Sequence, residues 1–176
     1  MGKRAKSVIA WVLGGGLLLL VAVLAYHGAF TSVSVAESEA GPFVFVFRHA
    51  PETSFSLVRS VTDELADVLE RGALRARKPA QVFYPAGDMD VGFLVEGASL
   101  EQLRAALGGS FELKELPRER FLETTFPFES PLSFFVAYFK VDPALRAARE
   151  AKGYAKTPVL VVNEGERVRY RQRIGS

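Results

Sequence analysis

The sequence contains no cysteine, and this absence excludes disulfide bonds, thiolate metal sites and cysteine nucleophiles. Histidine is scarce, with His27 and His49 as its two occurrences, so a metal site built on imidazole ligands is not expected. The sequence also lacks the motifs of a nucleophile elbow, a phosphate-binding loop, a zinc protease and a dinucleotide site. We therefore expect no catalytic residue, no metal and no cofactor, and we predict that the protein is not an enzyme.

Charge is distributed unevenly along the chain, although the formal net charge is +2. Three cations, Lys3, Arg4 and Lys6, precede the first apolar run, and no acidic residue occurs before Glu37. The part of the chain that follows this run is therefore close to neutral. A near-neutral domain lacks the basic surface of a nucleic-acid-binding protein. We expect no nucleic acid among the partners.

Residues 8–26 form an apolar run, VIAWVLGGGLLLLVAVLAY, without a charged side chain. As a helix this run spans about 28 Å, close to the thickness of the hydrocarbon core of a bilayer. The alternative is a cleaved signal peptide, whose apolar region is usually shorter. Because Tyr26, His27 and Gly28 also make a poor cleavage site, the sequence predicts a signal anchor. This anchor is a single-pass transmembrane helix over residues 8–26, preceded by a short basic N-terminus over residues 1–7.

The orientation of this predicted span follows from the charges beside it. The three cations before the run have no Lys or Arg counterpart after it until Arg48. Positive charge favours the cytoplasmic side of a membrane. The sequence therefore predicts a single-pass membrane protein whose domain lies on the non-cytoplasmic side.

Residues 27–41 are predicted to be a linker, despite a brief alternation at Val33 and Val35, and residues 42–174 a folded domain. Residues 43–47, FVFVF, have the high strand propensity of a buried strand. Apolar residues then recur at helical spacing between Leu57 and Leu69, opposite an acidic face. Two apolar runs separated by a turn follow over residues 81–95 and predict a hairpin. The first half of the domain is thus strand, helix, strand, strand.

The second half repeats this order after a short helix that begins at the capping box of Ser99 and Gln102. Residues 111–116 and 120–126 are predicted as strand, either as two strands or as one that continues through a bulge at Pro117. A longer helix over residues 131–152 contains Pro143, which would either kink it or begin a second helix. A closing hairpin occupies residues 157–174. The repeat predicts an α+β domain made of duplicated strand-helix-strand-strand units.

The segment 124–145, TTFPFESPLSFFVAYFKVDPAL, resembles a distinctive string in the family of the mammalian testis-expressed, single-span receptor for ER autophagy. That family belongs to the GyrI-like, effector-binding, small-molecule-binding superfamily. Weaker correspondences lie at residues 82–84 and 154–160, and an N-terminal span is shared. The resemblance implies a GyrI-like domain, preceded here by one N-terminal transmembrane helix. It also implies a ligand groove between the two units.

The groove that the resemblance implies would be lined by aromatic side chains, with one acid nearby. These ligand-binding candidates are Tyr84, Phe93, Glu123, Phe126, Phe128 and Tyr138. The family commonly has a glutamate in the penultimate strand that pairs with cationic ligands, but the matching position here is Val161. Glu164 or Glu166 would replace it only if the strand register slips toward the turn. The expected ligand is therefore a small molecule, possibly aromatic or apolar.

The last predicted strand alternates arginine with other residues. Because strand side chains alternate between faces, all four guanidinium groups should project from one side; they belong to Arg167, Arg169, Arg171 and Arg173. One interpretation is protection of an exposed sheet edge. The other is an anion-facing stripe that binds acidic lipid headgroups or an acidic partner.

Three functions remain in competition at the level of sequence. The favoured one is a membrane-anchored, non-catalytic GyrI-like domain that binds a small molecule in the groove between its repeats. A membrane-tethered adaptor for a protein partner or lipid headgroups is the alternative, and a GyrI-like hydrolase is a third. Asp88 and Asp90 are interpreted as solvated turn residues, and His49 as a surface or capping histidine rather than a catalytic base.

Overall fold

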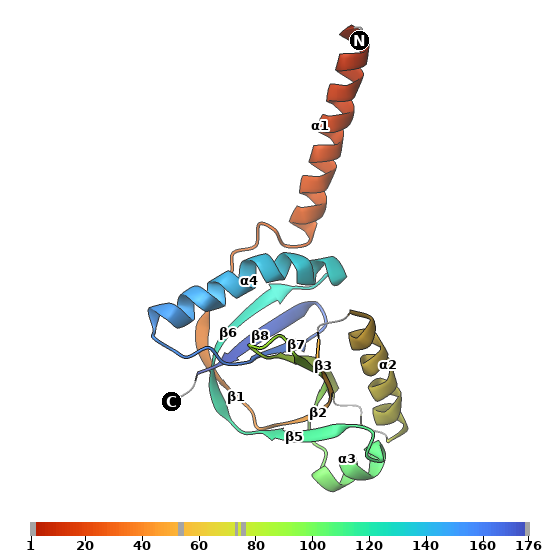
Figure 1. Ribbon diagram of the computed structural model, residues 1–176, viewed down its shortest axis with the longest axis vertical. Helices are drawn as coiled ribbons and strands as arrows, with labels where there is room; N and C mark the ends of the chain where they lie inside the picture. Colours follow the sequence, from red (N-terminus) through yellow and green to blue (C-terminus); the bar gives the residue numbers. More distant parts are fainter. Residues whose placement is uncertain (1–2, 53–54, 73, 75–76, 175–176) are drawn as a thin grey trace.

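The computed structural model describes residues 3–52, 55–72, 74 and 77–174, and the side chains of residues 3–10 and 55 are outside that description. The described elements are four helices and eight strands (Figure 1). The helices are α1 (Lys3–Tyr26), α2 (Phe55–Arg71), α3 (Leu100–Leu107) and α4 (Pro131–Ala151). The strands are β1 (Ala36–Ala40), β2 (Phe43–Ala50), β3 (Arg77–Phe83), β4 (Met89–Val95), β5 (Glu112–Leu116), β6 (Glu119–Pro127), β7 (Val159–Asn163) and β8 (Arg167–Arg173).

All eight strands belong to one antiparallel sheet with the order β1-β6-β8-β7-β3-β4-β2-β5. The sheet curls strongly, so that its two ends approach each other around an interior (Figure 1). Helices α2 and α4 cover its outer face, and α3 lies beside α2 and β5. The α+β class predicted from the sequence is therefore confirmed.

Alternation along the strands divides the apolar residues between the two faces of the sheet. On the outer face, Val46 and Phe93 pack with Leu65 of α2, and Leu122 and Phe126 pack with α4. On the inner face, which no described helix covers, the alternate residues of β2, β3, β4 and β7 form a second cluster. Its buried members are Phe45, Phe47, Ala80, Leu94, Leu160 and Val162. The sheet is thus apolar on both faces, which requires its inner face to be enclosed by its own curl.

The two halves of the sheet have the same internal order, and each contains a strand-helix-strand-strand unit. The first unit is β2, α2, β3 and β4, and the second is β6, α4, β7 and β8. The units meet where β3 pairs with β7, at Gln81 and Val161 among other positions. This arrangement confirms the predicted duplication.

Each half also lends an outer strand to the other. Strand β1 precedes the first unit but pairs with β6, and β5 precedes the second unit but pairs with β2. The sequence-based linker over residues 27–41 is therefore wrong in its last part, which is β1. The alternative of one continuous strand across Pro117 is wrong as well, because β5 and β6 pair with different neighbours.

Local signals place the helix boundaries where the sequence predicts them. The Ser99 hydroxyl accepts from the Gln102 amide and the Gln102 side chain accepts from the Ser99 amide, which confirms the capping box of α3. Ser130 caps α4 in the same way, since its hydroxyl accepts from the amide of Leu132. Helix α4 continues through Pro143 to Ala151, so a second helix does not begin there.

Helix α1 projects away from the sheet beyond α4 (Figure 1). A helix needs about 20 apolar residues to cross the hydrocarbon core. Within the fully described part of the chain, no helix combines the length and apolar character needed to cross a membrane. The predicted transmembrane helix over residues 8–26 and the predicted non-cytoplasmic membrane localisation are corrected accordingly.

The turn after α1 is fastened to α4 by polar contacts. The ammonium group of Lys140 donates to the carbonyl oxygens of Ala29 (2.6 Å) and Thr31 (2.7 Å). Nδ1 of the buried His27 lies 3.2 Å from the hydroxyl of Ser133. Residues that the sequence suggested as linker are thus held against the domain.

Candidate functional site

One row of side chains crosses the inner face of the sheet from β2 to β6. Strand pairing places each member opposite the next, at an interstrand spacing of about 4.8 Å. We call this set the inner-face row: His49, Asp90, Val82, Leu160, Arg171 and Glu123. It has an ionisable group at each end and apolar side chains in the middle. It also crosses the junction between the two halves, where Val82 pairs with Leu160.

Glu123 is the acceptor at one end of the row. Its Oε2 accepts from Nε of Arg171 (2.7 Å) and from the hydroxyl of Ser38 (3.0 Å), and its Oε1 accepts from Nη1 of Arg169 (2.6 Å). Burial alone would raise the pKa of Glu123, but these three donors, led by Arg171, outweigh it and hold the pKa below its usual value. Glu123 is therefore ionised at neutral pH, and both of its carboxylate oxygens accept hydrogen bonds.

Arg169 donates hydrogen bonds to two carboxylates, those of Glu123 on β6 and Glu164 just beyond β7. Its Nε and Nη2 both donate to Oε2 of Glu164 (2.9 and 2.8 Å), while its Nη1 donates to Glu123. The hydrogen bond to Glu164 is the main cause of the raised pKa of Arg169. Lys78 completes this group, with its Nζ 3.7 Å from Oε1 of Glu164. Arg169 thus acts as a bridge between two carboxylates.

Arg171 differs from Arg169 because its guanidinium group reaches across the curl of the sheet. Its Cζ lies 5.6 Å from the centre of the Phe43 ring, although β7, β3 and β4 separate β8 from β2 in the sheet order. Phe43 borders the inner apolar cluster, in which the rings of Phe45 and Phe47 stack at 5.0 Å. A cation, a carboxylate and an aromatic surface therefore meet at one place on the inner face.

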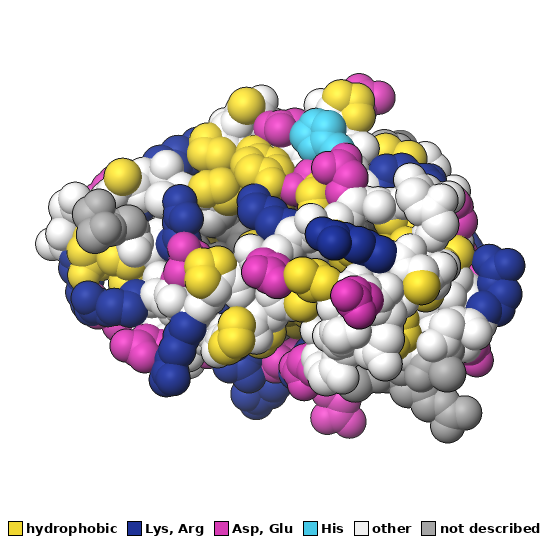
Figure 2. All heavy atoms as spheres, turned by 90° about the horizontal axis from the view of Figure 1, so that it is seen from below, with side chains coloured by type: hydrophobic (Ala, Val, Ile, Leu, Met, Phe, Trp, Pro, Cys, Tyr) yellow, Lys and Arg dark blue, Asp and Glu magenta, His cyan; other side chains and the backbone are white. Residues whose placement is uncertain are grey.

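The other end of the row is acidic. The side chain of Asp90 is buried, its Oδ2 accepts from the Tyr84 hydroxyl, and its Oδ1 lies 2.8 Å from Nδ1 of His49. Nε2 of His49 lies 3.8 Å from Oδ2 of Asp88. Figure 2 shows the exposed histidine bordered by acidic side chains. This end can hold a proton on His49 between two carboxylates.

The pKa values at this end move as the geometry requires. The hydrogen bond to Asp90 is the main cause of the raised pKa of His49, with further contributions from Asp88 and Glu112. The pKa of Tyr84 is raised chiefly by burial and then by Asp90. Tyr84 is therefore a neutral donor. The sequence-based interpretation of Asp90 as a solvated turn residue is wrong, because its side chain is buried by its neighbours on β2 and β3.

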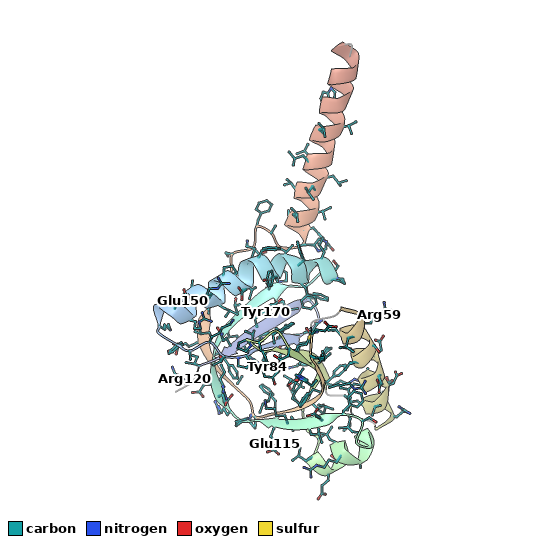
Figure 3. The ribbon with its side chains drawn as sticks, in the orientation of Figure 1. Arg59, Tyr84, Glu115, Arg120, Glu150 and Tyr170 are labelled. Carbon is teal, nitrogen blue, oxygen red and sulfur yellow. The ribbon has the colours of Figure 1, made fainter. Side chains whose placement is uncertain are left out.

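The predicted ligand-binding residues are not brought together in one groove. Tyr84 and Glu123 lie at opposite ends of the inner face, and Figure 3 labels Tyr84 within the curl of the sheet. Phe93 is buried beneath α2, and Phe126 is buried beneath α4. The remaining two lie on or near α4: the ring of Phe128 packs against Phe134, and Tyr138 is exposed. Of the six, Tyr84 and Glu123 contact the inner-face row.

The four arginines of β8 share one face, as their alternation predicts. Strand β8 lies between β6 and β7, however, so the interpretation as protection of a sheet edge is wrong. Arg169 and Arg171 point inward and bind Glu123, and Arg173 pairs with Glu119 at 3.1 Å. Arg167 is exposed beside a hollow of about 150 Å³ that Phe126 and Pro127 also line. The four therefore do not form one stripe that faces outward toward anions.

The strand register also shows on which face of the sheet Val161 lies, the position matched to the family's glutamate. Val161 pairs with Gln81 and with Tyr170, whose ring packs with the α4 cluster, so Val161 belongs to the outer face (Figure 3). Glu164 lies just beyond β7 and binds Arg169 on the inner side. Glu164 thus lies near the inner face without a slip of register, but its carboxylate is already paired with Arg169.

Sequence reasoning missed Phe43 and His49 as neighbours of this site. The available signal for Phe43 was the alternation in FVFVF, which places Phe43, Phe45 and Phe47 on one face. No local signal indicates that this face curls against β8. A larger hollow of about 350 Å³, between α2 and α3, is lined by Val68, Gly72 and Ala106 among others and lies outside the inner-face row.

Comparisons with known proteins identify the fold. No protein-family model and no curated protein sequence matches this chain. Among solved structures, the EcmrR C-terminal domain superposes with a TM-score of 0.61 at 9% identity, covering 82% of this chain and 98% of that one. SAV2435 bound to tetraphenylphosphonium gives 0.52 at 7% identity, with 81% and 94% covered. A putative transcription regulation protein from Staphylococcus aureus MU50 gives 0.51 at 8% identity, with 81% and 99% covered.

These similarities support the fold that the sequence resemblance implied. At such low identity they show the fold alone. A closer relationship to the mammalian receptor family stays a prediction.

Proposed function

We propose that this chain is a non-catalytic domain that binds a small molecule on the inner face of its curled sheet, across the junction of the two halves. The observation that carries the proposal is the contact between Arg171 and Phe43 beside Glu123. Charged groups beside an aromatic surface are the usual composition of a site that orients a small ligand. Among the described helices, none packs on this face.

The structural neighbours support this proposal at the level of fold. One of them, SAV2435, was solved with tetraphenylphosphonium bound, so a related architecture accommodates an aromatic ion. On the inner face of the present chain, Phe43 borders a cluster in which the rings of Phe45 and Phe47 stack.

The absence of catalysis is part of the proposal and rests on the state of the ionisable groups. Both oxygens of Glu123 accept hydrogen bonds from arginines, and this pairing lowers the pKa of the carboxyl group and makes it a weaker base. The carboxylate of Asp90 is likewise occupied by Tyr84 and His49. A general base must reach the proton it removes, and these two acids are committed to partners instead.

A thermal-shift screen of the full chain tests the proposal. The panel contains neutral, anionic and cationic aromatic compounds, and we expect at least one to raise the melting temperature. Val82→Trp fills the middle of the inner-face row and should abolish that rise. Glu101→Trp adds the same side chain on the exposed surface of α3 and should preserve it. The proposal fails if no compound stabilises the chain, or if Val82→Trp responds as the unmodified chain does.

An adaptor function for a protein partner is the second candidate, and a different surface favours it. Phe135, Tyr138 and Phe139 on α4 are 61%, 67% and 60% exposed, and their rings contact one another. Contiguous exposed apolar side chains of this kind often mark an interaction site. This candidate predicts that the panel leaves the melting temperature unchanged, while a Phe135→Ser, Tyr138→Ser, Phe139→Ser variant loses cross-links that the unmodified chain forms.

A further inference from the structure

Arg171 has hydrogen-bond donors that no described residue uses. Its side chain is 11% exposed, and its Nε donates to Glu123. Among the described residues, none accepts a hydrogen bond from its Nη1 or Nη2. These two nitrogens are not among the buried unpaired atoms of the described residues, so they are open to solvent. The terminal edge of Arg171 is therefore a cationic donor group on the inner-face row that a ligand can reach.

This free edge has a definite chemical preference. The two terminal nitrogens of a guanidinium group form a planar fork that matches the two oxygens of a carboxylate or a similar oxyanion. The ring of Phe43 lies against the same guanidinium group, 5.6 Å from Cζ. A planar aromatic acid can place its anionic group on the fork and its ring along Phe43.

A cationic ligand finds no unused acceptor group beside Arg171 among the described residues. Glu123 already accepts from Ser38, Arg169 and Arg171, so a cationic ligand would have to displace an arginine to reach it. Glu164 is occupied by Arg169 and approached by Lys78. An anion fills unused donors, whereas a cation must break existing ion pairs.

We propose that the inner face recognises an aromatic anion, a carboxylate or comparable planar acid, with the Nη1/Nη2 edge of Arg171 as its binding group. This inference rests on the proposed function and specifies its ligand class. It also separates this chain from SAV2435, whose bound tetraphenylphosphonium is a cation.

Calorimetric titration of the full chain with two probes of the same shape and opposite charge tests the inference. The probes are 2-naphthoate and 2-naphthamidinium, which share a ring system. We expect 2-naphthoate to bind at least about tenfold more tightly, since a charge-assisted hydrogen bond contributes enough for such a ratio. This comparison needs no variant, so it does not depend on how well a substituted chain folds.

Three variants assign the effect to one residue. Arg171→Gln should weaken 2-naphthoate binding about tenfold or more. Arg171→Lys retains the charge but not the planar fork, so its affinity for 2-naphthoate should lie between that of Arg171→Gln and that of the unmodified chain. Arg173→Gln is the matched control on the same strand, because Arg173 pairs with Glu119 away from the row, and it should bind within about twofold of the unmodified chain.

The possible failures are distinguishable. Equal or tighter binding of 2-naphthamidinium overturns the anionic class but leaves the proposed function standing, as does a panel in which only other compounds bind. Unchanged 2-naphthoate binding by Arg171→Gln overturns the role of Arg171. If neither probe nor any panel compound binds, the proposed function fails together with this inference.

Discussion

Nδ1 of His49 lies 2.8 Å from Oδ1 of Asp90, and the two side chains meet because β2 and β4 pair at these positions. This contact raises the pKa of His49, so the folded chain binds the imidazole proton more tightly than the unfolded chain does. The stabilisation is present in full below the unfolded pKa near 6.5 and is lost as pH rises through the higher folded pKa.

His49→Gln should therefore destabilise the chain more at pH 5.5 than at pH 9, because the stabilised imidazolium is present at pH 5.5 and is lost as pH rises through the raised folded pKa. Denaturant unfolding at the two pH values measures the difference. Asp88→Asn is the control, since Oδ2 of Asp88 is 3.8 Å from Nε2 and contributes less to the pKa of His49. A loss that is equal at both pH values would contradict the ion pair.

Glu123→Gln should destabilise the domain by about 1–3 kcal/mol at pH 7, because it leaves Arg169 and Arg171 partly buried beside a neutral amide. The pKa of Glu123 is lowered in the folded chain, so its contribution is present above the unfolded pKa near 4.3 and is lost as pH falls through the folded value. The gap between variant and unmodified chain should narrow in acid.

Denaturant unfolding from pH 7 down to pH 3 follows this gap. Glu119→Gln is the matched control: Glu119 pairs with Arg173, which is half-exposed, and the change should cost less than about 1 kcal/mol. Equal losses for the two variants would mean that burial does not strengthen the Glu123 network.

Gly92→Ala should disrupt the pairing of β2 with β4. A β-carbon at Gly92 would lie 1.8 Å from the carbonyl oxygen of Val46, so the strands must separate, at a cost on the order of 3 kcal/mol or more. Gly15→Ala is the contrasting change, because nothing lies within 4 Å of a β-carbon there and alanine favours a helix by up to about 1 kcal/mol. Thermal melts of both variants compare them, and a tolerated Gly92→Ala would refute this register.

Alanine substitution of the predicted groove aromatics should lower the stability of the domain by an amount that depends on how deeply each ring is buried. Phe126→Ala and Phe93→Ala should each cost roughly 3–5 kcal/mol, since their rings fill the clusters under α4 and α2. Tyr138→Ala should change stability by less than about 0.5 kcal/mol, because its side chain is exposed. Guanidinium unfolding curves give the three values. A small loss for Phe126→Ala would show that it lines a ligand site rather than a core.

The repeated unit could be predicted because its signals are local. Alternation in residues 43–47, helical periodicity from Leu57 to Leu69 and the capping box of Ser99 each depend on residues within a few positions of one another. The structure confirms these elements. The membrane span was also predicted from a local run, but within the fully described residues no helix is long and apolar enough to cross a membrane.

The site depends on contacts that no local pattern contains. Arg171 meets Glu123 through the pairing of β8 with β6, and it meets Phe43 only because the sheet curls. Strand β1 was missed for the same reason: its sequence, AESEA, has weak strand propensity, and pairing with β6 stabilises it. Register and curvature arise from packing of the whole sheet, so a sequence pattern does not specify them.

The exchange of β1 and β5 between the halves limits how this molecule can move. Rotation of one half away from the other about the β3–β7 junction would tear either the ladder between β1 and β6 or the ladder between β2 and β5. The two exchanged strands therefore hold the halves together on both sides of the junction and oppose hinge opening. Because α2 and α4 both pack on the outer face, a change in the curvature of the sheet would move the two helices together.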